Sequence, residues 1–242
     1  GRSAQAVAAC LDTLGSLTCG ASTRRTMQQA KFTQALLSKA SGGFQFLGKL
    51  TVPKRRTHFY GILGRLLLCK QNESLLLGFL QPFATSLEWV RNQTNLRSDA
   101  VRVRTEGLCR DLQGLLDVIE EPKNYQILFK WVYPSRLELW LRVLETWWDT
   151  ASLTTSVLRF VASLVHNKCK RVRFPTRSAN GLRLFKQAAK VVSTFCSRVR
   201  DKEPREGKLY DEKLKGIGLC LDLLSRSLSG NYVCFEVLEL YQ

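Results

Sequence analysis

The sequence of 242 residues lacks a long apolar run. Its longest stretch without a charged residue extends from Ser74 to Leu87 and contains Pro82. A helix that spans a membrane needs about 20 largely apolar residues, so we expect no membrane span. No apolar segment of the kind found in secretory signals follows the first residues. Because the chain starts without Met and stops within a pattern at Gln242, we expect it to be a fragment of a longer protein.

Clustered metal ligands are missing as well. The eight cysteines form no Cys-x-x-Cys pair, and the two histidines, His58 and His166, are far apart in the sequence. A structural zinc site draws on clustered pairs of ligands, so we expect no metal and no other cofactor. Most of the cysteines lie among apolar residues, where a free thiol packs as a small hydrophobic group. Cysteines of this kind fit a reducing compartment, the cytosol or the nucleus.

Sequence motifs of catalysis are also lacking. The chain contains no phosphate-binding loop, no Gly-x-Gly-x-x-Gly, no Gly-x-Ser-x-Gly and no His-Glu-x-x-His. We interpret His166 as a residue at a helix end, and Cys109 as a core residue of a helix. Asp149, which follows two tryptophans, is interpreted as a helix N-cap. We therefore expect no catalytic residues and no enzyme activity.

What the sequence does contain is apolar spacing with the period of a helix. One of these stretches follows Pro134 and begins with Ser135-x-x-Glu138, which matches a capping box. Alternation with period two is nowhere sustained, so the chain is predicted to be all-α. The three clearest apolar stripes are Phe59, Ile62, Leu63, Leu66 and Leu67; Leu137, Trp140, Leu141 and Leu144; and Leu214, Ile217, Leu221, Leu224 and Leu228.

The predicted helices fall into pairs whose starts lie about 40 residues apart, close to the period of HEAT and armadillo repeats. A single hairpin leaves apolar surface uncovered, and stacking of successive hairpins buries it. The pattern therefore predicts a right-handed superhelical solenoid of HEAT/armadillo-like hairpins, and a compact bundle of the same hairpins is the alternative. The predicted hairpins lie near 57–92, 98–132, 136–166 and 180–228.

The first part of the chain is less regular. Two further helices are predicted near 4–17 and 27–40, with Gly20 and Gly42-Gly43 as breaks. We therefore divide the sequence into a helical lead-in over 1–50 and HEAT-like repeats over 51–242.

The net charge of +17 is concentrated in one segment. Between Lys168 and Arg205 there are twelve basic and two acidic residues, so this segment carries +10 of the total. Such a field attracts an acidic protein surface, a nucleic-acid backbone or an anionic membrane. The alternative is a solvated surface that keeps the protein soluble. The candidate partner-binding residues are Lys168, Lys170, Arg171 and Arg173, in a predicted turn between hairpins, and Arg183, Lys186 and Lys190, on one face of the next helix.

Several short strings, spread over about residues 52–241, occur in a characteristic order and spacing. They are Arg56-Thr57-His58-Phe59-Tyr60, Leu63-Gly64-Arg65-Leu66-Leu67, Arg110-Asp111-Leu112-Gln113-Gly114, Trp131-Val132-Tyr133-Pro134-Ser135, Leu164-Val165-His166-Asn167, Ser178-Ala179-Asn180-Gly181-Leu182-Arg183-Leu184-Phe185, Leu214-Lys215-Gly216-Ile217 and Leu228-Ser229-Gly230-Asn231-Tyr232-Val233. In this order the strings resemble the later part of the exportin-7 and related Ran-binding proteins, which are importin-β-like nuclear transport receptors.

The resemblance implies a HEAT-repeat receptor that shuttles between nucleus and cytoplasm through the nuclear pore. It implies the GTP form of Ran, protein cargo and nucleoporins as partners, and neither an active site nor a metal or cofactor. Members of that family are much longer than this chain, and the first 50 residues match it less clearly. Two other functions remain open, a basic helical module that binds nucleic acid and a helical-repeat scaffold without a transport role. No zinc finger, glycine-rich loop or aromatic RNA-stacking motif supports the nucleic-acid alternative.

Overall fold

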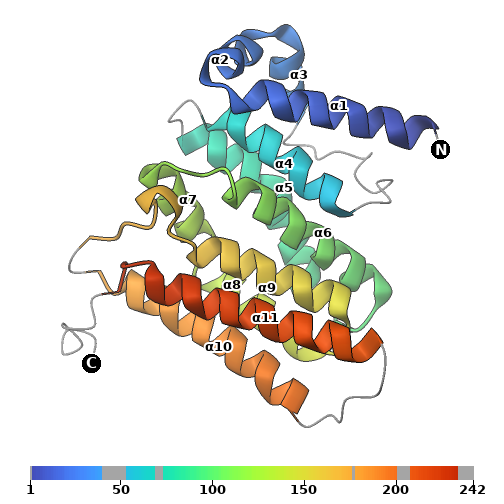
Figure 1. Ribbon diagram of the computed structural model, residues 1–242, viewed down its shortest axis with the longest axis vertical. Coiled ribbons are helices and arrows are strands. Elements are labelled where there is room, and N and C mark those ends of the chain that lie inside the picture. The colour runs from blue at the N-terminus through green and yellow to red at the C-terminus, as the bar shows by residue number, and fades with distance from the viewer. Residues whose placement is uncertain (1, 40–52, 69–72, 176–177, 201–207, 234–242) are drawn as a thin grey trace. The chain divides into compact units, whose positions relative to one another are not determined.

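The computed structural model describes residues 2–39, 53–68, 73–175, 178–200 and 208–233. Within these ranges the regular structure is helical and contains no strand, which confirms the predicted all-α class (Figure 1). The predicted break at Gly42-Gly43 lies outside the described residues. The α-helices are α1 (Arg2–Cys19), α2 (Ala21–Gln29), α3 (Lys31–Lys39), α4 (Pro53–Leu67), α5 (Glu73–Arg91), α6 (Asp99–Leu116), α7 (Pro122–Val132), α8 (Ser135–Trp147), α9 (Ala151–Val165), α10 (Asn180–Arg200) and α11 (Lys208–Ser229), and η3 (Lys168–Lys170) is a short 3-10 helix.

The chain forms two compact units, and the boundary between them falls within α6. The first unit consists of Gly1–Asn92 and Arg110–Ile119, and the second of Gln93–Cys109 and Glu120–Gln242. The division into a lead-in over 1–50 and repeats over 51–242 remains a prediction.

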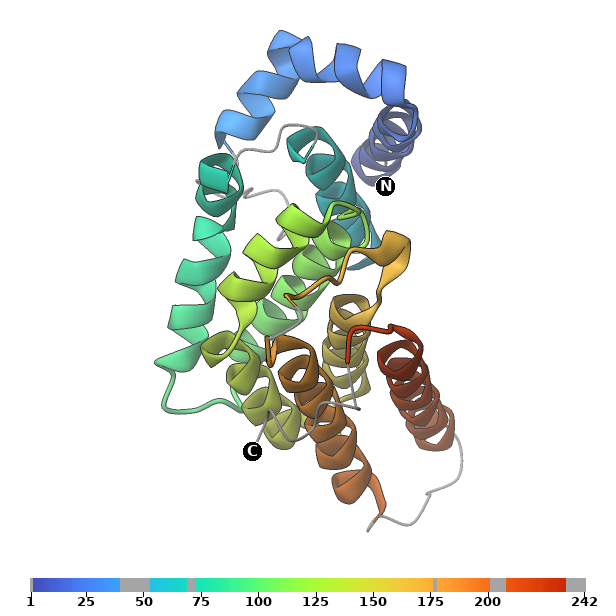
Figure 2. The same ribbon diagram turned by 90° about the vertical axis from the view of Figure 1, so that its left-hand side faces the viewer.

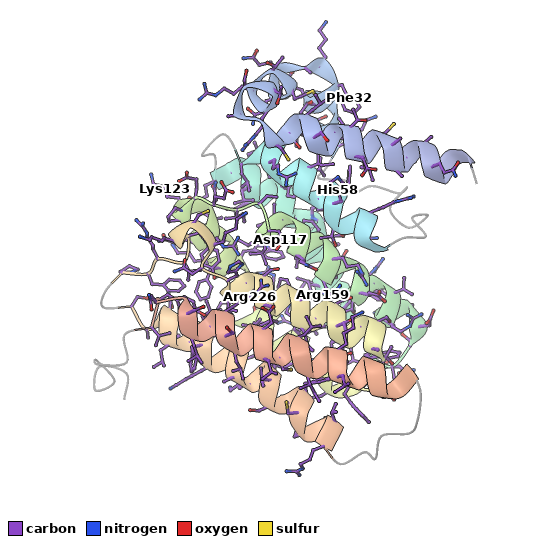
Figure 3. The ribbon with its side chains drawn as sticks, in the orientation of Figure 1. Phe32, His58, Asp117, Lys123, Arg159 and Arg226 are labelled. Atoms are coloured by element: carbon purple, nitrogen blue, oxygen red, sulfur yellow. The ribbon has the colours of Figure 1, made fainter. Side chains whose placement is uncertain are left out.

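In the first unit, α4 packs against α1, α2 and α3. His58, labelled in Figure 3, lies on α4 with its Nε2 atom 3.1 Å from the carbonyl oxygen of Leu11 on α1. A Cβ atom at Gly15 would lie 2.6 Å from the same imidazole nitrogen, so the ring fits against α1 only because residue 15 has no side chain. Three helices, rather than the predicted two, occupy the described part of the lead-in, because α2 ends at Gln29 and α3 begins at Lys31.

A second close contact in this unit joins α4 to the end of α6. A Cβ atom at Gly114 would lie 2.1 Å from the carbonyl oxygen of Thr57, so the backbones approach to a distance that only glycine permits. One turn earlier, the Arg56 guanidinium donates two hydrogen bonds to the Asp111 carboxylate, at 2.5 and 2.7 Å. Burial raises the pKa of the Asp111 carboxyl, and the Arg56 guanidinium opposes that shift.

The second unit contains two stacked helical hairpins. The α8–α9 hairpin and the α10–α11 hairpin each pack internally, and α10 also lies on α8 while α11 lies on α9 (Figures 1 and 2). The first helices of the two hairpins therefore form one layer and the second helices another. This neighbour-on-neighbour arrangement is that of a helical-repeat solenoid.

Helix α9 lies in the middle of this stack and packs against α8, α10 and α11. Twelve of its fifteen residues are buried, on every side of the helix. Several of its buried hydroxyl groups bond to backbone carbonyls within the helix: Thr155 Oγ1 donates to the Ala151 carbonyl at 2.6 Å, and Ser156 Oγ donates to the Ser152 carbonyl at 2.7 Å. Polar atoms satisfied in this way can be buried without a large desolvation penalty.

Two predicted helix caps are wrong. The N-cap of α8 is Pro134, so Ser135 does not hold the N-cap position that a capping box requires. The N-cap of α9 is Thr150. Asp149 instead accepts a hydrogen bond from Arg97 at 2.5 Å.

The apolar stripe along α11 is not a core face. The stripes on α4 and α8 are largely buried, as expected, but Leu214, Leu221 and Leu228 on α11 are 48, 63 and 60% exposed. The buried face of α11 is formed by Gly216, Cys220, Leu223 and Ser227 instead. Because α11 turns that face toward α9 and α10, the leucines at seven-residue intervals point away from the stack.

The two faces of α11 are expected to respond differently to truncation. Leu223→Ala should lower the free energy of unfolding by about 2–5 kcal/mol, because it leaves a cavity at a fully buried position. Leu221→Ala removes the same atoms from an exposed position and should change it by less than about 0.5 kcal/mol. Urea denaturation followed by circular dichroism measures both values. Equal losses would show that the outer face of α11 is covered in solution.

Candidate partner-binding surface

The basic segment predicted to bind a partner follows α9 and precedes α10, in the second unit. His166 is the C-cap of α9, and η3 begins two residues later. Cys169 and Lys170 have positive φ angles of 54° and 56°, a conformation that few residues other than glycine adopt. Two such residues in succession turn the backbone sharply, so neighbouring side chains point in different directions.

Arg171 points into the protein, unlike the other basic residues of this turn. Only 1% of Arg171 is exposed. Its guanidinium donates hydrogen bonds to the carbonyl oxygens of Ser163, at 2.5 Å, and His166, at 3.0 Å. These carbonyls belong to the last turn and the cap of α9, where a helix presents unpaired acceptors and a cation is stabilised by the helix dipole. Arg171 thus closes the C-terminal end of α9 and does not present its charge on the surface.

Side chains of helix α7 also contact this turn and the end of α9. The guanidinium of Arg171 lies over the Tyr125 ring, 5.6 Å from its centroid, which is within the range of a cation–π contact. The Tyr125 hydroxyl donates to the Leu164 carbonyl at 2.8 Å, and burial raises the pKa of Tyr125. Further along the turn, Gln126 donates to the Arg173 carbonyl at 2.8 Å, and the Phe174 ring packs on α7.

Asn167 ties the turn to the end of α11. Its side-chain nitrogen donates to the carbonyl oxygen of Gly230, and its side-chain oxygen accepts from the Val172 backbone at 2.7 Å. Arg226 of α11, labelled in Figure 3, contacts the His166 ring at 3.4 Å. The turn is therefore fixed by contacts from α7, α9 and α11.

The remaining six candidate residues are exposed. Lys168, Lys170 and Arg173 lie on the outside of the turn, and Lys168 pairs with Glu120 at 3.5 Å. Arg183, Lys186 and Lys190 lie on the side of α10 away from its buried residues. The structure thus places six basic side chains on the surface of one unit. Positions 176–177 and 201–205 of the basic segment lie outside the described residues.

Sequence reasoning missed the role of Arg97. Its guanidinium donates to the Thr146 carbonyl at the end of α8, at 2.7 Å, as well as to Asp149, and it lies 5.3 Å from the centroid of the Trp147 ring. These partners are about 50 residues away in the chain, and no local pattern in the sequence marks such a contact. Arg97 therefore donates to the end of a helix, as Arg171 does, but its side chain is 51% exposed.

Within the described ranges, no helix is long and apolar enough to cross a membrane. No group of three or more His, Cys, Asp or Glu side chains in those ranges is placed to hold a metal ion.

Comparison with known proteins identifies the relatives of this chain. No family model matches it, and no solved structure matches it. Exportin-7-A of Xenopus laevis is 34% identical over 244 residues, which cover 96% of this chain and 22% of the relative. Nearly the whole chain is similar to exportin-7 and Ran-binding proteins. Ran-binding protein 17 of Mus musculus is 35% identical over 77% of the chain, and Ran-binding protein 16 of Drosophila melanogaster is 32% identical over all of it.

This chain spans about a fifth of the length of these exportin-7 and Ran-binding relatives. Several of the strings that resemble the class contain residues at close contacts of the fold. Arg56, Asp111 and Gly114 join α4 to the end of α6 in the first unit, and Asn167 anchors the basic turn in the second.

Removing the Arg171 side chain should destabilise the second unit. Arg171→Ala leaves the carbonyls of Ser163 and His166 without their donors in a buried site, and we expect a loss of about 2–4 kcal/mol in the free energy of unfolding. Arg171→Lys keeps the charge but lacks the planar guanidinium with its several donors. Its loss in the free energy of unfolding should therefore be smaller than that of Arg171→Ala but not zero. Chemical denaturation measures each value.

The matched control for Arg171 is the neighbouring Lys170, which is exposed. Lys170→Ala should change the free energy of unfolding by less than about 0.5 kcal/mol. If Arg171→Ala were as mild as Lys170→Ala, Arg171 would not hold the end of α9 in solution.

Proposed function

We propose that this chain is part of a nuclear transport receptor of the exportin type and works by binding, with the GTP form of Ran and protein cargo as its partners. The observation that carries the proposal is the match to exportin-7 and Ran-binding proteins along nearly the whole chain. Stacked helical hairpins support it, because such repeats bind through extended surfaces rather than through a small active site. Such a receptor shuttles between the nucleus and the cytoplasm.

Within this function, the basic turn after α9 is proposed as a contact surface for an acidic face of a partner. Lys168, Lys170 and Arg173 are exposed on a backbone that three helices hold in place. A fixed array of charges loses less conformational entropy on binding than a flexible one. It also speeds the encounter with a partner of opposite charge. The exposed side of α10, with Arg183, Lys186 and Lys190, adds to the same positive field.

Charge reversal at the turn tests this assignment. The triple variant Lys168→Glu, Lys170→Glu and Arg173→Glu should bind GTP-loaded Ran at least about tenfold more weakly than the unchanged chain, because three attractive contacts become repulsive. Titration by surface plasmon resonance, with Ran loaded with a non-hydrolysable GTP analogue or with GDP, gives the dissociation constants. The GTP form should bind more tightly than the GDP form.

The control carries the same change of charge at exposed residues elsewhere in the second unit, Lys130→Glu, Arg142→Glu and Arg198→Glu. It should lose much less affinity than the turn variant. Equal losses would show that only net charge matters and would remove the turn from the binding surface. If the unchanged chain binds neither form of Ran, the proposal that this chain binds Ran is wrong.

Because the net positive charge would also attract nucleic acid, binding to duplex DNA is tested separately. Binding to duplex DNA would weaken as salt rises, with a slope of log K against log salt of about −0.9 for each phosphate neutralised. We expect weak binding to a 20-base-pair duplex, lost near physiological salt, and Ran binding that persists there. Tight duplex binding at physiological salt, without Ran binding, would favour the nucleic-acid module instead.

A further inference from the structure

The exposed side of α11 alternates large apolar residues with small ones. Within the second unit, α11 packs against α9 and α10 through the face that contains Gly216, Cys220 and Leu223 (Figures 1 and 2). Another side of the helix is uncovered, and we call its exposed residues the leucine seam: Leu214, Gly218, Leu221, Ser225 and Leu228. Contiguous exposed apolar residues of this kind are typical of surfaces that contact another molecule.

The spacing of the leucine seam matches a partner that is itself an α-helix. Its members follow one another at intervals of four, three, four and three residues, so they repeat every 3.5 residues on average, as the contact positions of paired helices do. In such pairs a large side chain of one helix enters a gap between side chains of the other. A Cβ atom at Gly218 would meet no atom within 4 Å, so the gap between Leu214 and Leu221 is open.

The charge of the hairpin that carries the leucine seam indicates what the flanks of that partner helix contain. Helices α10 and α11 together contain nine basic and three acidic residues, a net charge of +6, and the three acidic residues are all on α11. One of these, Asp222, is paired with Arg226 at 2.8 Å. Lys215 is exposed next to Leu214. Acidic side chains on the flanks of a docked helix are therefore attracted, and basic ones are repelled.

A second copy of this chain fits the leucine seam less well. Its own α10–α11 hairpin carries the same net positive charge, so two hairpins that met through their seams would repel each other. The charge favours a different, acidic molecule as the occupant.

We propose that the leucine seam binds one amphipathic α-helix of a partner protein, with large apolar residues at heptad spacing toward the seam and Asp or Glu on its flanks. From Leu214 to Leu228 the seam extends over about 21 Å of helix, so a partner helix of about four turns covers it. Docking removes the three leucines from water, and Gly218 and Ser225 leave room for the large residues of the partner. This surface is separate from the Ran contact proposed at the basic turn and does not depend on it.

Synthetic peptides test the chemistry of the partner. The probe is a fluorescein-labelled helical peptide of about 18 residues, with leucine at the positions that face the seam and glutamate on the flanks. It should bind the chain at least about tenfold more tightly than a peptide with lysine on the flanks, and this ratio should shrink as salt screens the charges. A third peptide keeps the glutamates but has serine in place of leucine, and it should bind at least about tenfold more weakly than the probe. Fluorescence anisotropy measures each dissociation constant.

Gly218→Leu tests the leucine seam itself. Because no atom lies within 4 Å of a Cβ atom at this position, the free chain should accept the leucine. Leucine also has the better helix propensity, so the melting temperature should stay the same or rise. The added side chain closes the gap, and the affinity for the probe should fall at least about tenfold. A residue with only a structural role would not give a stable chain that binds more weakly.

Gly78→Leu is the matched control. Gly78 is an exposed glycine of α5 in the first unit, and a Cβ atom there also meets no atom within 4 Å. This variant should bind the probe as the unchanged chain does. Leu221→Ser and Leu77→Ser form a second matched pair, since both leucines are exposed. Only the seam variant, Leu221→Ser, should lose affinity, by at least about threefold.

Any of four results would overturn the proposal. Equal affinity for the glutamate and lysine peptides would contradict the acidic flanks, and equal affinity for the leucine and serine peptides would show that net charge alone attracts them. Unchanged probe binding by Gly218→Leu would show that the peptide docks elsewhere. Self-association of the unchanged chain in sedimentation experiments, abolished by Leu221→Ser, would assign the leucine seam to a second copy instead.

Discussion

The second unit depends on the burial of α9. Because this helix is apolar or internally bonded on every side, it needs a neighbour on each of them, and α8, α10 and α11 supply three. Burial also leaves the carbonyls at the end of α9 away from water, where an unpaired acceptor is costly. Arg171 and Tyr125 donate to these carbonyls. The position of the basic turn thus follows from the need to close a buried helix end.

Much of this architecture could be predicted from the sequence, because apolar residues at helical spacing report directly which segments form helices. The periodicity on α4 and α8 also identified buried faces correctly. On α11 it did not, since Leu221 and Leu228 are exposed while Gly216 and Cys220 form the packed face. Periodicity shows that one side of a helix is apolar, but it does not show whether a neighbour covers that side. A small residue at a tight contact can mark the buried side better than a large one.

The candidate surface shows a similar limit for charge. A count of basic residues treats Arg171 and Lys170 alike. Arg171, however, is buried at the C-terminal end of α9, whereas Lys170 is exposed. What separates them is the local backbone, with positive φ angles at Cys169 and Lys170, and acceptors that become neighbours only in the folded chain. Arg97 and Asp149 illustrate the same difficulty, because a pair separated by about 50 residues leaves no local signal. The sequence therefore located the basic segment but could not divide its charges between fold and surface.

Because some residues of the basic turn stabilise the fold and others are only exposed, substitutions in this turn would have two different effects. In the basic turn, Arg171 and Asn167 bond the backbone to α9 and to the end of α11, so substitutions at these two positions would disturb the packing of the helices. Lys168, Lys170 and Arg173 extend from the same backbone without filling the core. Substitutions that change their charge would leave the packing of the hairpins intact, and under the proposed function they would change the affinity for an acidic partner without changing the fold. A helical-repeat protein of this kind would adapt to partners through its turns and exposed helix faces, while its buried helix ends keep the hairpins in register.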